Sequence, residues 1–326
     1  MNNPPLDNTA QKKDELLSVI QSDFPIVSRP FKVLADRIEL TEREVINSIN
    51  SLMDEGIIRA FGPVFETGRL GYVSTLIAAK VGNDRVTELA TAMLDINEIT
   101  HNYLRDNEFN LWFTITALNS DVMDKIIKWV KKFPEVNKVL NLPTKKVFKI
   151  NAVWGDGKSK ISNVNYKTKV PPFNDNGKNL VRALQNEFPI VENPFRVIAD
   201  SIDTDELEIL DTINSWLDNG TIRRFGARLS HKKIGYTHNI LAAWEGKNSG
   251  LWGEKFAEFT QISHCYLRES HDDWHYELYT MIHAKSDTEA DEILKTMKNI
   301  ARGAKMVAMK TLYELKKTNM KYFMEE

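Results

Sequence analysis

Residues 264–283 read HCYLRESHDDWHYELYTMIH, and this stretch holds four of the seven histidines of the chain, its only cysteine and three tyrosines. Side chains two residues apart in a β-strand point to the same face. We therefore expect His264, Tyr266 and Arg268 to share one face of a strand, with a second strand following at 276–283. That face would present a titratable imidazole, a phenol and a cation.

A weaker copy of this stretch lies in the first half of the chain, where residues 101–105 read HNYLR and residues 111–114 read LWFT. His101, Tyr103 and Arg105 repeat the same alternation. Other matches recur with a shift of 164 residues: FPIV at 24 and 188, PF at 30 and 194, AD at 35 and 199, FG at 61 and 225, and GY at 71 and 235. Matches in one register indicate a tandem of two similar halves.

The size and composition of the chain limit its class. A length of 326 residues predicts two or more domains, and a formal net charge of −2 offers no general attraction to nucleic acid or to an anionic membrane. One cysteine and no C-x-x-C exclude an internal disulfide and a thiolate iron–sulfur or zinc site built from this chain alone. Without an apolar leader or a span-length apolar run, we expect a soluble, cytoplasmic protein.

Each half begins with a pattern of three helices, expected in the first half at 14–21, 30–37 and 41–55, after a loose arm that ends near residue 11. Thr41 with Glu44 three residues later predicts a capping box. A small β-wing expected at 57–65 completes a winged helix-turn-helix. The remainder of each half has the order β-α-β-β-α-β, which is the ferredoxin-like pattern, with last strands expected at 147–153 and 307–315.

The predicted fold class is therefore α+β, a tandem of a winged helix-turn-helix followed by a ferredoxin-like domain. The predicted domains are winged modules at 12–66 and 178–230, ferredoxin-like domains at 67–154 and 231–318, a linker at 155–177 and a tail at 319–326.

This order of modules resembles the Lrp/AsnC architecture, whose usual members are DNA-binding regulators that sense small molecules at subunit interfaces. The third helix of the second half, at 203–218, carries six acidic residues and no Lys or Arg. Duplex DNA has one phosphate charge per ~1.7 Å of helix axis and would repel such a helix. We therefore expect no DNA binding.

The sequence resembles more closely the siroheme decarboxylase family, Lrp/AsnC-like enzymes of alternative haem and haem d1 biosynthesis. The residues that carry the likeness are IRRFGA at 222–227, His231, Gly235, Tyr236, Asn239, HCYLR at 264–268, Trp274 and YTMIH at 279–283. The family commonly uses two related subunits, so this chain resembles both subunits joined.

The resemblance implies removal of CO₂ from two acetate side chains of siroheme, which gives 12,18-didecarboxysiroheme. Siroheme carries eight carboxylates, and arginine binds carboxylates with charge-assisted hydrogen bonds. The candidates for this contact are Arg105, Arg268, Arg223 and Arg224. Histidine titrates near neutral pH, so His231 and His264 are candidates for the general acid or for an axial ligand of the substrate iron.

Aromatic candidates to flank the ring plane are Tyr236, Tyr266, Trp112 and Trp274. The remaining candidate binding residues are His101, Tyr103, His238 and His283. We expect no cofactor beyond the iron of the substrate, no membrane partner, and either a homodimer or association with related subunits.

The first half lacks several of the candidate site residues of the second half. The sequence alignment pairs His231 with Thr67, His238 with Ser74, Asn239 with Thr75, and His283 with Ala117. We therefore expect one complete pocket, made mainly by the second half and closed by the first across a pseudo-two-fold interface. His271 and His275 are expected in a solvated turn.

Two alternatives remain open from sequence: a ligand-responsive transcriptional regulator and a non-catalytic tetrapyrrole-binding subunit. The sequence is compatible with a role in the biosynthesis of haem b and with a role in that of haem d1.

Overall fold

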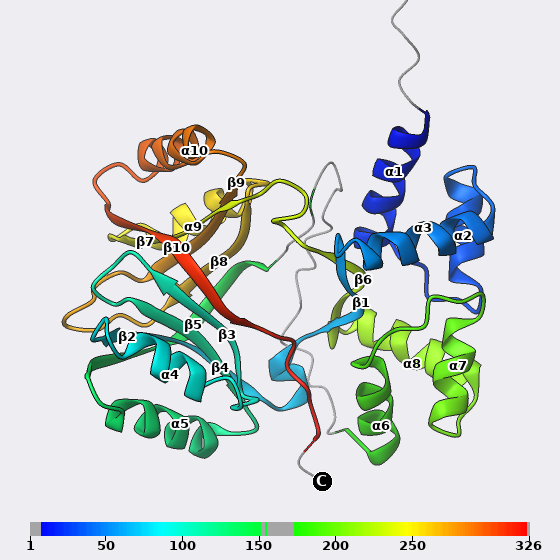
Figure 1. The fold of residues 1–326 in the computed structure, drawn as a ribbon, viewed down its shortest axis with the longest axis horizontal. Helices are drawn as coiled ribbons and strands as arrows, with labels where there is room; N and C mark the ends of the chain where they lie inside the picture. The colour runs from blue at the N-terminus through cyan, green and yellow to red at the C-terminus, as the bar shows by residue number, and fades with distance from the viewer. Residues whose placement is uncertain (1–7, 151–153, 155–172, 325–326) are drawn as a thin grey trace, which may run out of the picture. The chain divides into compact units, whose positions relative to one another are not determined.

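The computed structural model describes residues 8–150, 154 and 173–324. Contacts divide the chain into two compact units, one of residues 1–70, 153–234 and 321–326 and the other of residues 71–152 and 235–320. Each unit takes corresponding parts from both halves of the repeat. The winged modules form the first unit, and the ferredoxin-like repeats form the second (Figure 1).

Three helices open each half of the first unit: α1 (Asn8–Ser22), α2 (Pro30–Arg37) and α3 (Glu42–Asp54), then α6 (Asp175–Leu184), α7 (Pro194–Ser201) and α8 (Glu206–Asp218). The predicted capping box is confirmed, because Thr41 and Glu44 each accept a hydrogen bond from the other's backbone N–H. The predicted arm was wrong in part, since α1 already begins at Asn8. Helix α6 begins inside the predicted linker, where the side chain of Asn174 accepts a hydrogen bond from Gly177 N.

The strands that follow these helices are β1 (Ile58–Phe65) and β6 (Ile222–Leu229), which pair with each other in a two-stranded antiparallel sheet. The β-wing predicted at 57–65 is one continuous strand in the structure, and its partner is the equivalent strand of the other module. Gly62 lies opposite Gly226, its own repeat equivalent, so a local two-fold axis passes between them. Around them four phenylalanines of the repeated FP and FG motifs stack: Phe24 on Phe225, with ring centroids 5.7 Å apart, and Phe61 on Phe188 at 5.4 Å. These aromatic contacts between the modules favour the strand pair over local hairpins.

The second unit is a closed barrel with the strand order β10-β3-β4-β2-β5-β8-β9-β7. The strands are β2 (Val73–Val81), β3 (Ile99–Arg105), β4 (Leu111–Ala117), β5 (Val136–Ile150), β7 (His238–Glu245), β8 (Ile262–Arg268), β9 (Leu278–Ala284) and β10 (Lys305–Lys317). The helices are α4 (Val86–Ala92), α5 (Ser120–Lys132), α9 (Ser249–Ala257) and α10 (Asp287–Ile300), and the short 3₁₀ helix η1 (Thr67–Leu70) lies in the first unit. Each half has the predicted β-α-β-β-α-β order. Figure 1 shows α4 and α5 beside the first-half strands and α9 and α10 beside the second-half strands.

Strands β5 and β10 join the two repeats, because each changes partner part-way along. Strand β5 pairs with β2 as far as Pro143 and with β8 from Thr144. Strand β10 pairs with β7 as far as Lys310 and with β3 from Thr311. The predicted start of β5 at residue 147 was wrong by eleven residues. The PTKK sequence at 143–146 reads as a loop, but its proline falls where the strand changes partner, a position that tolerates a missing N–H.

Strand alternation separates two kinds of core in the barrel. Residues such as Trp244 and Cys265 face outward and pack under α9 and α10, and the first half has an equivalent core under α4 and α5. The inward faces of the strands, together with the β8–β9 loop, form a third cluster that includes Trp112, Trp274 and Tyr279. In the described part of the chain, no helix is long and apolar enough to cross a membrane.

The outward position of Cys265 gives a testable prediction. Its thiol is fully buried, and burial raises its pKa to about 12. Because the thiolate is the reactive form, we expect iodoacetamide at pH 8 to leave Cys265 unmodified in the folded protein and to alkylate it in denaturant, as measured by intact mass. Native alkylation at the rate of the denatured chain would contradict this packing.

Candidate functional site

In each His-x-Tyr-x-Arg segment the three side chains share one face of a strand, as predicted, and the structure shows that this is the inner face of the barrel. In β8 the ring centroids of His264 and Tyr266 are 6.0 Å apart, and the guanidinium of Arg268 lies 4.7 Å from the Tyr266 centroid. In β3 the corresponding distances, for His101 with Tyr103 and Tyr103 with Arg105, are 6.4 Å and 5.2 Å. The rows are therefore two pseudo-equivalent sets of imidazole, phenol and cation.

The arginine of each row also holds a strand that changes partner. Arg268 Nη1 donates to Leu142 O at 2.9 Å and to Thr144 Oγ1 at 3.0 Å, which lie on either side of the partner change in β5. Arg105 Nη1 does the same in β10, donating to Met309 O at 3.4 Å and to Thr311 Oγ1 at 2.9 Å. Each arginine thus stabilises the junction between the two repeats.

These two guanidinium groups carry positive charge inside the barrel. Arg105 is 3% exposed and Arg268 is 9% exposed. Burial lowers the pKa of both groups, that of Arg105 to about 10. A guanidinium group keeps its proton in proteins, so both side chains are cations. Within the described residues neither forms an ion pair with a carboxylate, and the Nε atom of each is buried without a hydrogen-bond partner. A buried cation with an unused donor favours an anionic ligand.

The second-half row carries an additional chain of hydrogen bonds. Ser263 Oγ lies 2.8 Å from His264 Nδ1 and 2.8 Å from His283 Nε2. His283 Nδ1 in turn contacts Asn239 Oδ1. Three strands, β7, β8 and β9, therefore contribute to one continuous polar chain that ends on His264.

The first half has hydroxyl groups where the second has Asn239 and His283. Leu104 faces Leu111 as Leu267 faces Leu278, and counting along the paired strands makes Ser74 the counterpart of Asn239 and Thr116 that of His283. Ser74 Oγ and Thr116 Oγ1 are 3.1 Å apart.

The sequence alignment around these strands was therefore wrong by one residue. It paired Asn239 with Thr75 and His283 with Ala117, and the same shift makes Val73, and not Ser74, the counterpart of His238. A one-residue insertion before β7 and the different lengths of the loops before β4 and β9 are invisible to motif matching. A slip of one residue moves every side chain of a strand to the opposite face.

Both predicted tryptophans are buried in the inward cluster. Trp112 Nε1 donates to Phe109 O at 2.6 Å, and Trp274 Nε1 donates to Tyr279 Oη at 2.7 Å. The two indole centroids are 5.7 Å apart. Their polar atoms are thus satisfied by the protein, and their evident role is to fill the barrel.

Several other histidines lie apart from the rows. His238 alternates with the inward Asn239 and lies on the helix-covered face, with Nε2 3.6 Å from Asp287 Oδ2. His271 lies at the expected turn, where it is half-buried and contacts Asn141 O through Nε2 at 2.6 Å. His275 is exposed, as expected. Tyr236 precedes β7 and lies under Lys285, 5.2 Å from its ring centroid.

Three predicted site residues belong to the first unit. His231 follows β6, is 7% exposed, and has its ring centroid 6.1 Å from that of Trp154. Arg223 forms an ion pair with Glu66. Arg224 Nη1 donates to Gln21 O at 2.6 Å and to Ala227 O at 2.8 Å, and burial lowers its pKa to about 10. Both arginines thus have structural partners at the β1–β6 sheet.

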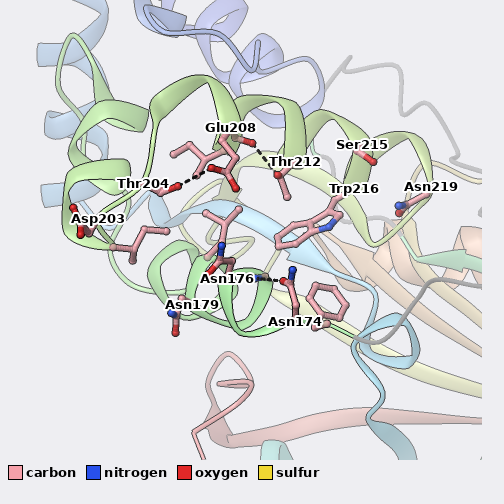
Figure 2. Close-up of a pocket in the computed structure, with 15 residues that line it drawn as sticks. Asn174, Asn176, Asn179, Asp203, Thr204, Glu208, Thr212, Ser215, Trp216 and Asn219 are labelled. Carbon is pink, nitrogen blue, oxygen red and sulfur yellow. Dashed lines mark hydrogen bonds between the residues drawn. The ribbon is translucent and has the colours of Figure 1, made fainter.

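A pocket of about 500 Å³ lies in the second winged module, between α6 and α8 (Figure 2). Figure 2 shows Trp216, Asn174 and Glu208 among its lining side chains. The lining includes two carboxylates, no Lys or Arg, and none of the predicted site residues. A ligand with many carboxylates would be repelled there. Elsewhere in the described ranges, no group of three or more His, Cys, Asp or Glu could hold a metal ion.

Sequence reasoning missed Ser263 and assigned no role to Asn239. Strict alternation would place Ser263 on the face opposite to His264. The pairing of β8 with β9 is irregular between Ile262 and His264, so Ser263 contacts both His264 and His283. No pattern in the sequence marks this irregularity.

Comparisons with known proteins agree with this architecture. The AsnC-like ligand binding domain matches residues 69–149 and 233–316, and the siroheme decarboxylase NirDL-like HTH domain matches residues 13–59 and 177–223. The siroheme decarboxylase of Hydrogenobacter thermophilus is 32% identical over 320 residues, which cover 96% of this chain and 95% of that protein. The siroheme decarboxylase beta subunit of Oleidesulfovibrio alaskensis is 38% identical over 154 residues, 46% of this chain and 98% of that subunit.

A solved structure extends the match to three dimensions. The crystal structure of the siroheme decarboxylase NirDL in co-complex with an iron-uroporphyrin III analogue has a TM-score of 0.74 and 29% identity, and the match covers 96% of this chain and 95% of that one. The predicted fold of tandem helix-turn-helix and ferredoxin-like modules is thereby confirmed. The chain belongs to the siroheme decarboxylase family, with both AsnC-like repeats in one polypeptide.

Proposed function

We propose that this protein is a siroheme decarboxylase that removes CO₂ from two acetate side chains and yields 12,18-didecarboxysiroheme. The observation that carries the proposal is the second-half row, in which His264, Tyr266 and Arg268 share the inner face of β8 and the Nε atom of Arg268 is buried without a hydrogen-bond partner. A carboxylate and a proton donor are the two things that the reaction must bring together. The iron-uroporphyrin III analogue in the related crystal structure is a ligand of the same chemical class.

Binding would depend on the charge of the arginines. Each hydrogen bond to a charged group contributes about 1.5–3 kcal/mol to the binding free energy. Arg268 and Arg105 each offer a buried Nε donor to an anion. Arg223 and Arg224 remain secondary candidates, because Glu66 and backbone carbonyls already occupy them.

The reaction replaces a CH₂–COO⁻ group by CH₃ and consumes one proton. The ring carbon next to the one that bears the acetate accepts a proton from a general acid, which leaves a positive charge on the pyrrole ring. The bond to the carboxylate then breaks, CO₂ leaves, and the electron pair forms an exocyclic double bond that neutralises the ring. Protonation of this methylene carbon and loss of the proton from the ring carbon complete the methyl group.

His264 is the acid that the geometry supports best, because its ring lies beside Tyr266 in the row that contains Arg268. His231 is the second candidate, as acid or as axial ligand of the substrate iron. No cofactor beyond that iron enters the scheme. Binding to DNA is not part of the proposal, since α8 carries four acidic residues and no Lys or Arg.

The direct test is anaerobic incubation of the protein with siroheme, followed by mass measurement of the extracted tetrapyrrole. We expect two successive losses of CO₂ that do not occur without protein. Bound siroheme of unchanged mass would identify a tetrapyrrole carrier instead. Tight, steeply salt-dependent binding to duplex DNA without turnover would identify a regulator.

We also expect siroheme to bind at one equivalent per chain, because the first half has Ser74 and Thr116 where the second has Asn239 and His283. An anaerobic absorbance titration against known chain concentrations measures this number. Two equivalents bound with equal affinity would show that both rows form complete pockets.

A further inference from the structure

We propose that Ser263, His283 and Asn239 are positioning residues that hold His264 in one tautomer. Because of this series of hydrogen bonds, the second-half row is the one that transfers protons. The inference rests on the proposed function. It adds roles for Ser263 and Asn239, and it moves His283 from substrate contact to support of His264.

Asn239 sets the direction of each hydrogen bond in this series. An amide oxygen only accepts hydrogen bonds, so Asn239 Oδ1 requires a proton on His283 Nδ1. A neutral His283 then has a lone pair on Nε2, and the Ser263 hydroxyl, 2.8 Å away, donates to it. The Ser263 oxygen is left as an acceptor toward His264.

The consequence for His264 is a defined protonation pattern. Its Nδ1 lies 2.8 Å from Ser263 Oγ and donates to that oxygen. Nδ1 therefore keeps its proton, and Nε2 is the nitrogen that gains and loses the proton used in the reaction. A fixed partner on one ring nitrogen also fixes the orientation of the ring, as it does for catalytic and metal-bound histidines.

The first-half row has no equivalent of the hydrogen bond from His283 to Asn239. Thr100 Oγ1 lies 3.0 Å from His101 Nδ1, which reproduces the first link of the chain. At the position of His283, however, stands Thr116, whose hydroxyl contacts Ser74 at 3.1 Å. A hydroxyl can donate or accept, so this pair does not impose a direction on its neighbours. The two rows thus share their residue types and differ in what sets the tautomer.

The chain offers matched variants for a test. Ser263→Ala removes the link, whereas Ser263→Thr keeps a hydroxyl and reproduces the first-half residue. We expect Ser263→Ala to lower kcat about 10–100-fold with KM within about threefold of wild type, and Ser263→Thr to restore most of the activity, as for other residues that orient a functional histidine. Thr100→Ala, the same change in the first half, is expected to leave kcat within about twofold of wild type.

A second measurement reports the tautomer without turnover. In ¹⁵N-histidine-labelled protein, NMR should show His264 protonated at Nδ1 in the wild type and in Ser263→Thr. In Ser263→Ala and in Asn239→Ala, the signal should shift toward the Nε2-protonated form that neutral histidine prefers in water. Asn239→Ala changes a half-buried residue at the start of β7, which makes it the safer variant if Ser263→Ala folds poorly.

The outcomes are separable. If the wild-type protein releases CO₂ and Ser263→Ala has the same kcat, the positioning role is overturned and the proposed function stands. The same holds if neither alanine variant changes the tautomer of His264. Equal losses in Ser263→Ala and Thr100→Ala would overturn the distinction between the rows. A wild-type protein that releases no CO₂ would contradict the proposed function, and the NMR result would still decide whether the chain orients His264.

Discussion

Replacing His264 by alanine is expected to lower the rate of CO₂ release by about 10²–10⁴-fold, the usual contribution of a positioned general acid. Siroheme binding should be nearly intact, because the lost interaction acts in the transition state. The binding cation Arg268 lies two residues away and makes its strand contacts independently of the imidazole. Single-turnover rates and binding constants, measured anaerobically, separate the two effects.

The matched variants are His231→Ala and His101→Ala. We expect His231→Ala to behave like His264→Ala if His231 also serves as an acid, and His101→Ala to have a smaller effect on rate and to alter mainly binding. The absorption spectrum of the bound substrate should be recorded for each variant, because a changed spectrum identifies an axial ligand of the iron. Unchanged rates in both His231→Ala and His264→Ala would remove histidine acid catalysis from the mechanism.

The largest expected effect on stability is that of Gly226→Ala. Gly226 has φ of 144°, and an added Cβ would lie 2.2 Å from the backbone oxygen of Ile20 in α1. The backbone of α1 or of β6 must therefore move, in addition to the strain of a positive φ in a residue with a side chain. We expect the free energy of unfolding to fall by about 4 kcal/mol or more, which is exceptional for a single substitution.

Gly62→Ala is the matched control, because Gly62 is the repeat equivalent of Gly226 and lies opposite it in the sheet. Its φ of 132° carries similar strain, but the nearest atom to an added Cβ is Leu184 O at 3.5 Å, an ordinary contact. Its expected cost is therefore about 1–3 kcal/mol. Chemical denaturation measures both, and hydrogen exchange in α1 and β6 locates the change. Equal losses would show that φ strain, and not the approach of α1, dominates.

The sequence alone determined the features that depend on short-range patterns. The 164-residue shift identified the tandem halves, Thr41 and Glu44 identified the start of α3, and alternation placed His264, Tyr266 and Arg268 on one face. These predictions were confirmed because helix caps and strand faces are set by residues two to four positions apart.

Only the tertiary structure decided which strands pair and in what register. The pairing of β1 with β6, the partner changes in β5 and β10 and the irregularity beside Ser263 join residues from opposite halves or adjust the register between strands. The alternation of a strand defines its faces but not its partner, and a slip of one residue exchanges those faces. Because such pairing depends on packing between distant segments, His238 was expected in the site although it faces the helices, while Ser263 was overlooked although it lies between two histidines.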